Sequence, residues 1–241
     1  MLSQFLPPGA RTVLDVGCNV GDSLRWAHER GIERLRGVDI NPAAVEKATK
    51  RLSALGDVQV LHASADELPF PDGSADLVLC LEVLEHIPAE LRAKAVSEMA
   101  RVLAPGGRLI LTTPHRGAFA FLDPENMRFR LPGIHRALSR LVGGAGKERG
   151  YVGQKHGVVW HHHFTRAELE ALLLPRFRVV GIRGRGLLLF PLCTWLQWPF
   201  YRAQRLRSRT FRLLDWLMQT DYATRYPLAL AYNVVVVADK R

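Results

Sequence analysis

A short apolar run that ends in a glycine turn constrains the fold of this chain more than any other feature. Residues 12–16 have the length of a buried parallel strand, and a turn containing Gly17 and Gly21 follows them. Because glycine has no Cβ, the main chain of this turn can approach a ligand closely. Residues 22–30 should form a helix whose free N–H groups face that ligand. Asp39, at the end of the next strand, is placed to accept both hydroxyls of a ribose, so the pattern predicts a nucleoside-binding α/β fold.

The alternation of strands and helices continues along the first half of the chain. Residues 75–81 and 108–113 have the apolar character of buried strands, and a helix is expected to end near residue 103. Pro105 and Gly106 stop that helix, because proline removes a donor and glycine permits a left-handed cap. Strands connected in this way predict a largely parallel sheet.

Taken together, the glycine turn, the segment 62–76 and the Pro105-Gly106-Gly107 junction resemble the class I S-adenosylmethionine-dependent methyltransferases, in particular their type 11 group. The resemblance is close over residues 11–114 and looser over residues 160–182 and 230–241. There is also some resemblance to the ubiquinone-biosynthesis O-methyltransferases.

This resemblance implies one methyltransferase domain over residues 1–241. Its fold would be α/β, with a Rossmann-like sheet of seven mostly parallel strands and helices on both faces. The last strand, near residues 231–238, would lie antiparallel beside the fifth. Substrate-side insertions would be a cover over residues 115–159, with a helix near 134–142, and an apolar and basic segment over residues 187–229.

The resemblance also implies S-adenosylmethionine as the cofactor. Asn19 stands where the family usually has a glycine, and asparagine tolerates positive φ better than most residues. Ser64 stands where an adenine-contacting acid is usual, and Asp66 is close enough to replace it. The implied cofactor-binding residues are Asp15, Gly17, Cys18, Asn19, Gly21, Asp39, Ile40, Ser64, Ala65, Asp66, Cys80, Leu81 and Glu82.

The cysteines and the first ten residues bear on location. The three cysteines have neither a disulfide pattern nor the spacing of a zinc site, which favours a reducing cytoplasm. Residues 1–10 contain two prolines and no basic residue, so no signal peptide is expected.

The net charge differs strongly between the first and second halves of the chain. The net charge is +10, and residues 115–212 carry an excess of 13 positive charges, whereas residues 1–114 have a net charge of −3. Residues 187–201 contain no charge but are too short and too interrupted by proline to span a bilayer, and five arginines follow within residues 202–212. This pattern suits an element on an anionic membrane surface or a lid over a lipid-like acceptor, and equally a helical pair packed on the sheet. No RNA-binding signature is visible, so nucleic acid is not the expected partner.

Two groups of polar residues are candidates for chemistry. On a helix, Glu82, Glu85 and His86 would share a face, which would suit an acid–base cluster, a structural role or a divalent metal site. The main expectation is that the chain binds no metal ion. The alternative is a metal ion held by these three residues. Residues 161–163 are three histidines before a helix that Thr165 should cap, and they cannot all point the same way. His115 follows the fifth strand, at the edge where parallel sheets bind ligands.

The expected activity is methyl transfer to a small-molecule or lipid-like acceptor, at oxygen. His86 or His115 would take the proton of the acceptor hydroxyl. The alternatives are an RNA methyltransferase and a non-catalytic S-adenosylmethionine-binding protein. The sequence predicts a cytoplasmic protein, with peripheral binding to the inner face of the membrane as one of the open alternatives for residues 187–218, and it does not indicate an oligomeric state.

Overall fold

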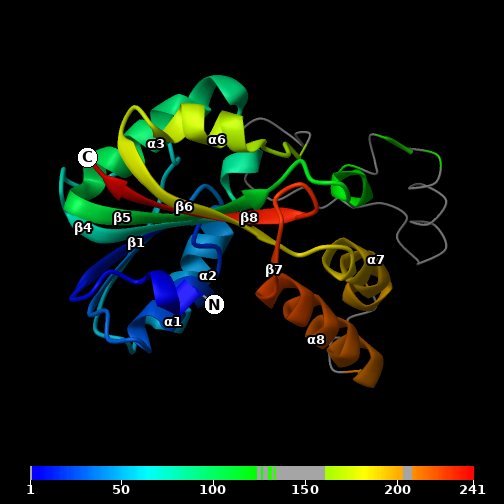
Figure 1. Ribbon diagram of the computed structural model, residues 1–241. Helices are drawn as coiled ribbons and strands as arrows, with labels where there is room; N and C mark the ends of the chain where they lie inside the picture. Colours follow the sequence, from blue (N-terminus) through cyan, green and yellow to red (C-terminus); the bar gives the residue numbers. More distant parts are fainter. Residues whose placement is uncertain (1, 124–125, 127–129, 132, 134–160, 203–207) are drawn as a thin grey trace.

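The computed structural model describes residues 2–123, 126, 130, 131, 133, 161–202 and 208–241. Its centre is a single sheet in the order β3-β2-β1-β4-β5-β8-β6-β7, with helices on both faces (Figure 1). Most of the predicted cover insertion, residues 115–159, lies outside the described residues, as does the helix expected near residues 134–142.

The first half alternates strands and helices as the sequence predicts. The strands are β1 (Thr12–Val16), β2 (Arg34–Asp39), β3 (Asp57–His62), β4 (Ala75–Leu81) and β5 (Leu103–Pro114), and neighbours among them pair in parallel. The helices are α1 (Asp22–His28), α2 (Pro42–Leu52) and α3 (Ala89–Val102).

The second half completes the sheet with antiparallel strands. They are β6 (Phe177–Arg185), β7 (Arg225–Tyr226) and β8 (Asn233–Lys240), and β8 lies between β5 and β6. The antiparallel position of the last strand beside the fifth is confirmed. The predicted count of seven strands is wrong by one, because the two residues of β7 pair with the end of β6 as the chain leaves helix α8.

Two apolar layers bury the faces of the sheet. On one face α3 and α6 (Arg166–Leu173) pack through residues such as Met99 and Leu169, and on the other α1 and α2 pack through Leu24 and Leu52 (Figure 1). The predicted cap of α6 is present as a complete capping box between Thr165 and Glu168.

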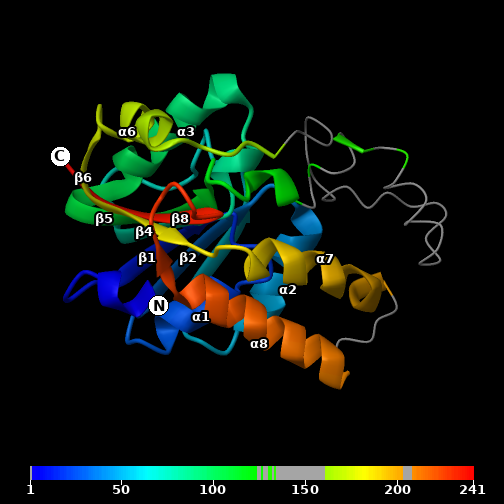
Figure 2. The ribbon, with the colours of Figure 1, turned by 45° about the vertical axis from the view of Figure 1, so that its right-hand side comes forward.

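The segment predicted as an apolar and basic insertion forms two helices, α7 (Leu189–Arg202) and α8 (Arg209–Ala223). They lie beside each other at the edge of the sheet that carries the carboxyl end of β5, away from the C-terminus (Figure 2). Asp221 in α8 is buried and accepts hydrogen bonds from the main-chain N–H groups of Leu187 and Phe190, at 2.9 and 2.7 Å. The start of α7 is therefore capped by its partner helix. Within the described part of the chain, neither these helices nor any other is both long and apolar enough to cross a membrane.

Candidate active site

The glycine turn after β1 has the backbone that the sequence predicts. Gly17, Asn19 and Gly21 have φ angles of 78°, 46° and 83°, so Asn19 takes the left-handed conformation expected of it. The N–H groups of Gly17 and Cys18 both donate to the carbonyl of Val38, at 2.8 and 2.9 Å, which ties the turn to the end of β2. A Cβ at Gly17 would collide with the side chain of Val83, so glycine is required here for space as well as for conformation.

Asp39 lies at the carboxyl end of β2, beside this turn. One carboxylate oxygen accepts the N–H of Asn19 and the other accepts the N–H of Asn41, both at 2.8 Å. Each oxygen keeps a second lone pair, so the carboxylate can still accept a ribose hydroxyl. The two bonds orient the predicted ribose acid before any ligand arrives.

Asp15 lies beneath the turn in the middle of the sheet. Its side chain is buried, and within the described part of the chain one carboxylate oxygen has no hydrogen-bond partner. Burial raises the pKa of Asp15 to about 7, and the Asp39 charge adds to the rise while a hydrogen bond from Ser23 opposes it. Burial also raises the pKa of the Cys18 and Cys80 thiols, so neither is a nucleophile.

Ser64 and Asp66, the two candidates for contact with adenine, are brought together. The Ser64 hydroxyl donates to Asp66, and the same carboxylate pairs with Lys94 at 3.1 Å. These hydrogen bonds, led by that of Ser64, lower the pKa of Asp66. The two residues form one polar unit after β3, with Ala65 between them. At the end of β3, Nε2 of His62 lies 3.0 Å from the carbonyl of Ile40.

Glu82 lies directly after β4, beyond Cys80 and Leu81, but not on a helix. Its φ is 56°, and a single 3-10 turn, Leu84–His86, follows it. Its N–H donates to the carbonyl of Thr112, while its carboxylate accepts the side-chain amide of Asn233 at 2.9 Å. The expectation that Glu82, Glu85 and His86 share a helical face is therefore wrong, because a left-handed residue at 82 turns its side chain toward β8.

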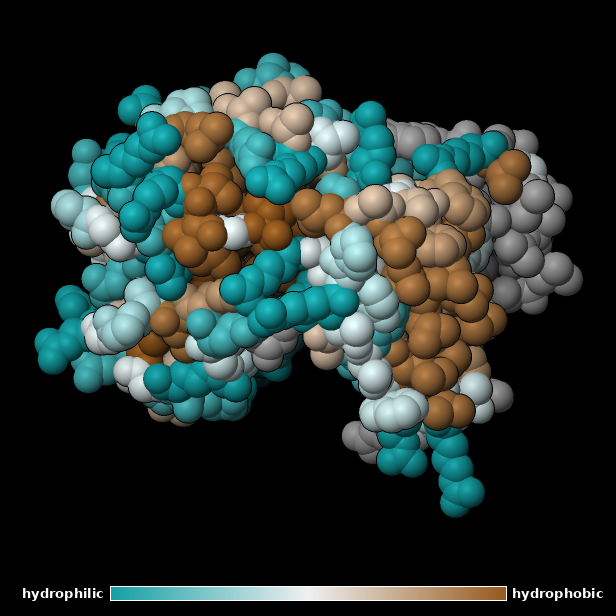
Figure 3. Space-filling view, viewed as in Figure 1, coloured by the Kyte–Doolittle hydropathy of each residue, from teal (hydrophilic) through white to brown (hydrophobic). Residues whose placement is uncertain are grey.

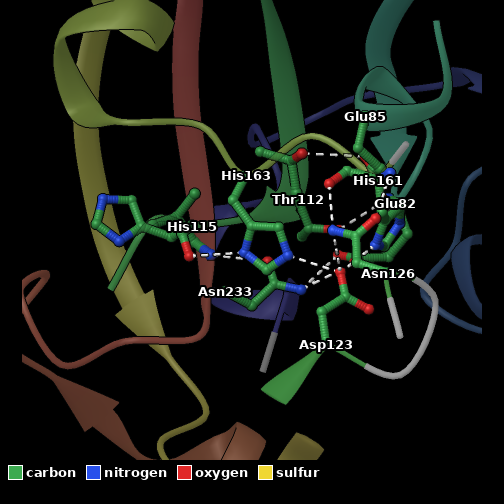
Figure 4. Close-up of polar contacts among 11 residues, drawn as sticks. Glu82, Glu85, Thr112, His115, Asp123, Asn126, His161, His163 and Asn233 are labelled. Carbon is green, nitrogen blue, oxygen red and sulfur yellow. Dashed lines mark hydrogen bonds and ion pairs between the residues drawn. The ribbon is translucent and has the colours of Figure 1, made fainter. Parts of the chain in front are cut away.

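A second polar cluster lies at the carboxyl ends of β4 and β5, and Figure 4 shows how its side chains meet. Glu85 is fully buried. Its Oε2 accepts the hydroxyl of Thr113 at 3.0 Å, while its Oε1 has no hydrogen-bond partner among the residues that the structure describes. Nε2 of His161 lies 3.6 Å from that Oε1, and the ring of His86 lies 4.8 Å from the ring of His161. The predicted pair Glu85 and His86 thus gains His161 in place of Glu82.

Asp123 holds the far side of this cluster. Its Oδ2 lies 2.7 Å from Nδ1 of His161 and 2.6 Å from Nε2 of His163, and both Asp123 and His163 are buried. Burial disfavours a charged imidazole, but the hydrogen bond to Asp123 and the carboxylate of Glu85 raise the pKa of His161 to about 10. Asn126 fixes the main chain of His161 by two hydrogen bonds of 2.7 and 2.8 Å.

The remaining histidines point elsewhere. The ring of His115 points away from Asp123, and only its carbonyl meets the cluster, 3.1 Å from Nδ1 of His163 (Figure 4). His162 turns out to Glu168, at 3.4 Å. Sequence reasoning did not find Asp123, Asn126 or Asn233, and it had no means of choosing among residues 161–163. The only sequence signal was the run of histidines itself.

Comparison with known proteins accords with this geometry. Residues 14–111 match the model of a family described as "Methyltransferase domain". The chain is 39% identical over 134 residues to a ubiquinone biosynthesis O-methyltransferase of Alkalilimnicola ehrlichii, covering 52% of each chain. It is 37% identical over 108 residues to the chloroplastic tocopherol O-methyltransferase of Arabidopsis thaliana, covering 43% of this chain and 30% of that protein. The chain thus spans about half, or less, of the length of these relatives.

The fold has matches among solved structures. An S-adenosylmethionine-dependent methyltransferase from Methanosarcina mazei aligns with a TM-score of 0.56 at 22% identity, over 98% of this chain and 95% of that one. Residues 14–111 therefore form a methyltransferase domain.

Proposed function

We propose that the chain is an enzyme that transfers a methyl group from S-adenosylmethionine to a hydroxyl oxygen of a small, lipid-like acceptor. The donor would lie on the glycine turn, with its ribose on Asp39. Because the sulfonium methyl is already activated, the protein has mainly to align the acceptor oxygen with it and exclude water.

One observation carries this proposal: the glycine turn lies against Val83, in the segment that leads to the polar cluster. Val83, two residues before Glu85, packs so closely on Gly17 that a Cβ there would collide with it. A ligand on the turn would therefore lie next to the segment that carries Glu85 and His86. We infer that the acceptor hydroxyl binds against His86, because the ring of His115 points away from Asp123 and the polar cluster (Figure 4).

The names of the two relatives favour oxygen as the acceptor atom. Both are O-methyltransferases, one of tocopherol and one of ubiquinone biosynthesis. An oxygen acceptor must lose a proton as it is methylated, and the cluster of Glu85, His86 and His161 supplies polar groups for that step.

The lipid-like character of the acceptor is inferred from the surface of α7 and α8. We call the apolar face the set of exposed residues Leu188, Leu189, Leu192, Leu196, Leu213 and Trp216. Figure 3 shows apolar residues gathered over these helices. The indole N–H of Trp195 in α7 donates to the carbonyl of Leu122 at 2.7 Å, next to Asp123 of the cluster. The apolar face is therefore joined to the proposed acceptor site, and we propose that it meets acceptors dissolved in an anionic membrane.

The test combines cofactor binding with transfer. We expect the purified chain to bind S-adenosylmethionine in a calorimetric titration and to transfer a labelled methyl group to a phenol that carries a long alkyl chain, faster than to the same phenol without it. Transfer to RNA alone, or cofactor binding with no transfer to any phenol, would contradict the proposal.

The membrane contact has a separate test. The double variant Leu213→Asp and Trp216→Asp should lose sedimentation with anionic vesicles, because two charges enter the apolar face. The matched control is Val180→Asp, which places a charge on an exposed apolar residue of β6 outside that face. Equal sedimentation of the double variant and the wild type would refute the contact.

A further inference from the structure

The last turn of α8 reaches the carboxyl edge of the sheet through Tyr222. Helix α8 ends at Ala223, next to β7 (Figure 1). A hydrogen bond joins the side chains of Tyr222 and Thr112, and Thr112 pairs in register with Leu81, the last residue of β4. Ligands of parallel sheets bind at this edge. The helical pair therefore contributes a side chain to the edge where donor and acceptor are expected.

Aromatic neighbours hold the ring of Tyr222. The ring centroid of Phe190, in the first turn of α7, lies 5.0 Å from that of Tyr222 and 5.5 Å from that of Tyr232. The Tyr232 ring in turn meets the ring of His163 edge-on, at 5.6 Å. Rings whose centroids lie about 4.5 to 7 Å apart attract each other. A row of rings thus runs from α8 to the polar cluster and fixes the place of Tyr222.

Solvent reaches the surroundings of the Tyr222 hydroxyl. The N–H of Glu82 donates to the hydroxyl of Thr112 at 3.1 Å, and the charge of Glu82 acts on Tyr222. Glu82 is exposed, whereas Thr112 beside it is buried. Because solvent reaches Glu82 at the ends of two inner strands, a ligand bound at this edge can reach the same place.

Tyr222 is suited to donate a hydrogen bond there. Burial and the negative charges of Glu82 and Glu85 raise the pKa of Tyr222 well above its ordinary value of 10, although the Thr112 hydrogen bond opposes the rise. The phenol therefore keeps its proton. The oxygen of Thr112 already accepts the N–H of Glu82, so its own proton is available to the oxygen of Tyr222. Tyr222 can then donate its proton to an oxygen of a ligand.

The end of β5 separates two polar groups. Successive residues of a strand point to opposite faces of the sheet. Thr113 donates to Glu85 of the polar cluster, while Thr112 meets Tyr222. A ring that lies across the end of β5 would therefore meet His86 on one side and Tyr222 on the other.

We propose that Tyr222 is a specificity-determining residue of the acceptor site, which donates a hydrogen bond to a second oxygen of the acceptor while the reacting hydroxyl lies at His86. This inference rests on the proposed function and adds that the acceptor carries two oxygens on one ring. An acceptor without the second oxygen would leave the Tyr222 hydroxyl without that partner, and it would be used less well.

The test compares four phenols that carry the same long alkyl chain, one without a methoxy group and three with one methoxy group ortho, meta or para to the hydroxyl. A methoxy oxygen accepts a hydrogen bond but is not itself methylated. We expect the wild type to use one methoxy isomer with a kcat/KM about tenfold higher than that of the parent phenol. Tyr222→Phe keeps the ring and removes the donor, so this ratio should fall to about one.

The matched control is Tyr226→Phe. It removes a hydroxyl that donates to Asp221 instead, at 2.7 Å, and should keep the preference for the methoxy isomer. A merely structural role of Tyr222 would lower kcat/KM for all four phenols by the same factor and so leave the preference in place.

Three outcomes would overturn the role of Tyr222: no methoxy isomer favoured by the wild type, an unchanged preference in Tyr222→Phe, or weaker binding of S-adenosylmethionine by that variant, which would place Tyr222 on the donor. Failure of the wild type to methylate any phenol would instead refute the proposed function. Calorimetric titration of the four phenols in the presence of S-adenosylhomocysteine then tests Tyr222 by itself. A methoxy isomer that binds the wild type about tenfold more tightly than Tyr222→Phe would support its role, and equal affinities would refute it.

Discussion

The side-chain amide of Asn233 donates to both carboxylate oxygens of Glu82, at 2.9 Å each. Asn233 is the first residue of β8 and pairs in register with Pro114 at the end of β5, while Glu82 follows β4 directly. This contact joins residues 151 positions apart and ties the start of β8 to the residue that follows β4.

Replacement of Asn233 by alanine should destabilise the protein. Asn233 is fully buried, and its loss removes the donor to the Glu82 carboxylate and leaves a gap between β5 and β6. We expect a decrease of about 1 to 3 kcal/mol in the free energy of unfolding, measured by urea denaturation. Gln59→Ala removes an exposed amide from β3 and should change the same quantity by less than about 0.5 kcal/mol. Equal effects of the two changes would contradict the assigned role of Asn233.

Removal of the Asp39 carboxylate should weaken S-adenosylmethionine binding. The carboxylate is held by the N–H groups of Asn19 and Asn41, so its position is fixed without the ligand. Asp39→Ala should raise the dissociation constant by about 10- to 100-fold in a calorimetric titration, since hydrogen bonds to a charged group contribute about 1.5 to 3 kcal/mol each. The control Asp57→Asn alters an exposed carboxylate of β3 that pairs with Arg36 of β2. An unchanged affinity in Asp39→Ala would exclude this residue as the ribose acid.

The sequence alone predicts those features of the fold and the site that a few neighbouring residues determine. The left-handed Asn19, the placement of Asp39 and the capping box of Thr165 and Glu168 each depend on a few adjacent positions, and all three were predicted. The partners of Glu82 and His161 could not be predicted, because Asn233 lies 151 positions away and Asp123 lies 38 positions away. Local patterns carry no information on such contacts.

The errors have the same origin. Glu82, Glu85 and His86 fit a helical spacing, but the pairing of Glu82 with Thr112 after β4 overrides that local preference. The two residues of β7 are too few to show a strand periodicity, so the eighth strand was not predictable.

The ionisation of Asp15 should make stability depend on pH. Its pKa is raised from 3.8 to about 7, so the folded state favours the neutral acid. The contribution of Asp15 to stability is therefore greatest below pH 4 and is lost as the pH rises through about 7. Asp15→Asn removes this dependence. As the pH rises from 5 to 8, the unfolding free energy of the variant minus that of the wild type should increase by about 2 to 3 kcal/mol. Parallel pH profiles of the two proteins in urea denaturation, measured without cofactor, would show that Asp15 is not the group responsible.

Asp221→Ala should loosen α7 while leaving the sheet intact. The carboxylate of Asp221 accepts the N–H groups of Leu187 and Phe190 and the hydroxyl of Tyr226, the last at 2.7 Å. Without it, the first turn of α7 loses two of its acceptors, and we expect its amides to exchange with deuterium at least about tenfold faster, since 1.4 kcal/mol corresponds to a factor of ten. Amides of β1 and β4 should keep their exchange rates, because α8 packs mainly on α7. Asp215→Ala, at a half-buried position of the same helix, is the control and should leave α7 unchanged. Faster exchange throughout the sheet in Asp221→Ala would mean that α7 and α8 unfold together with the domain and do not form a separately stabilised pair.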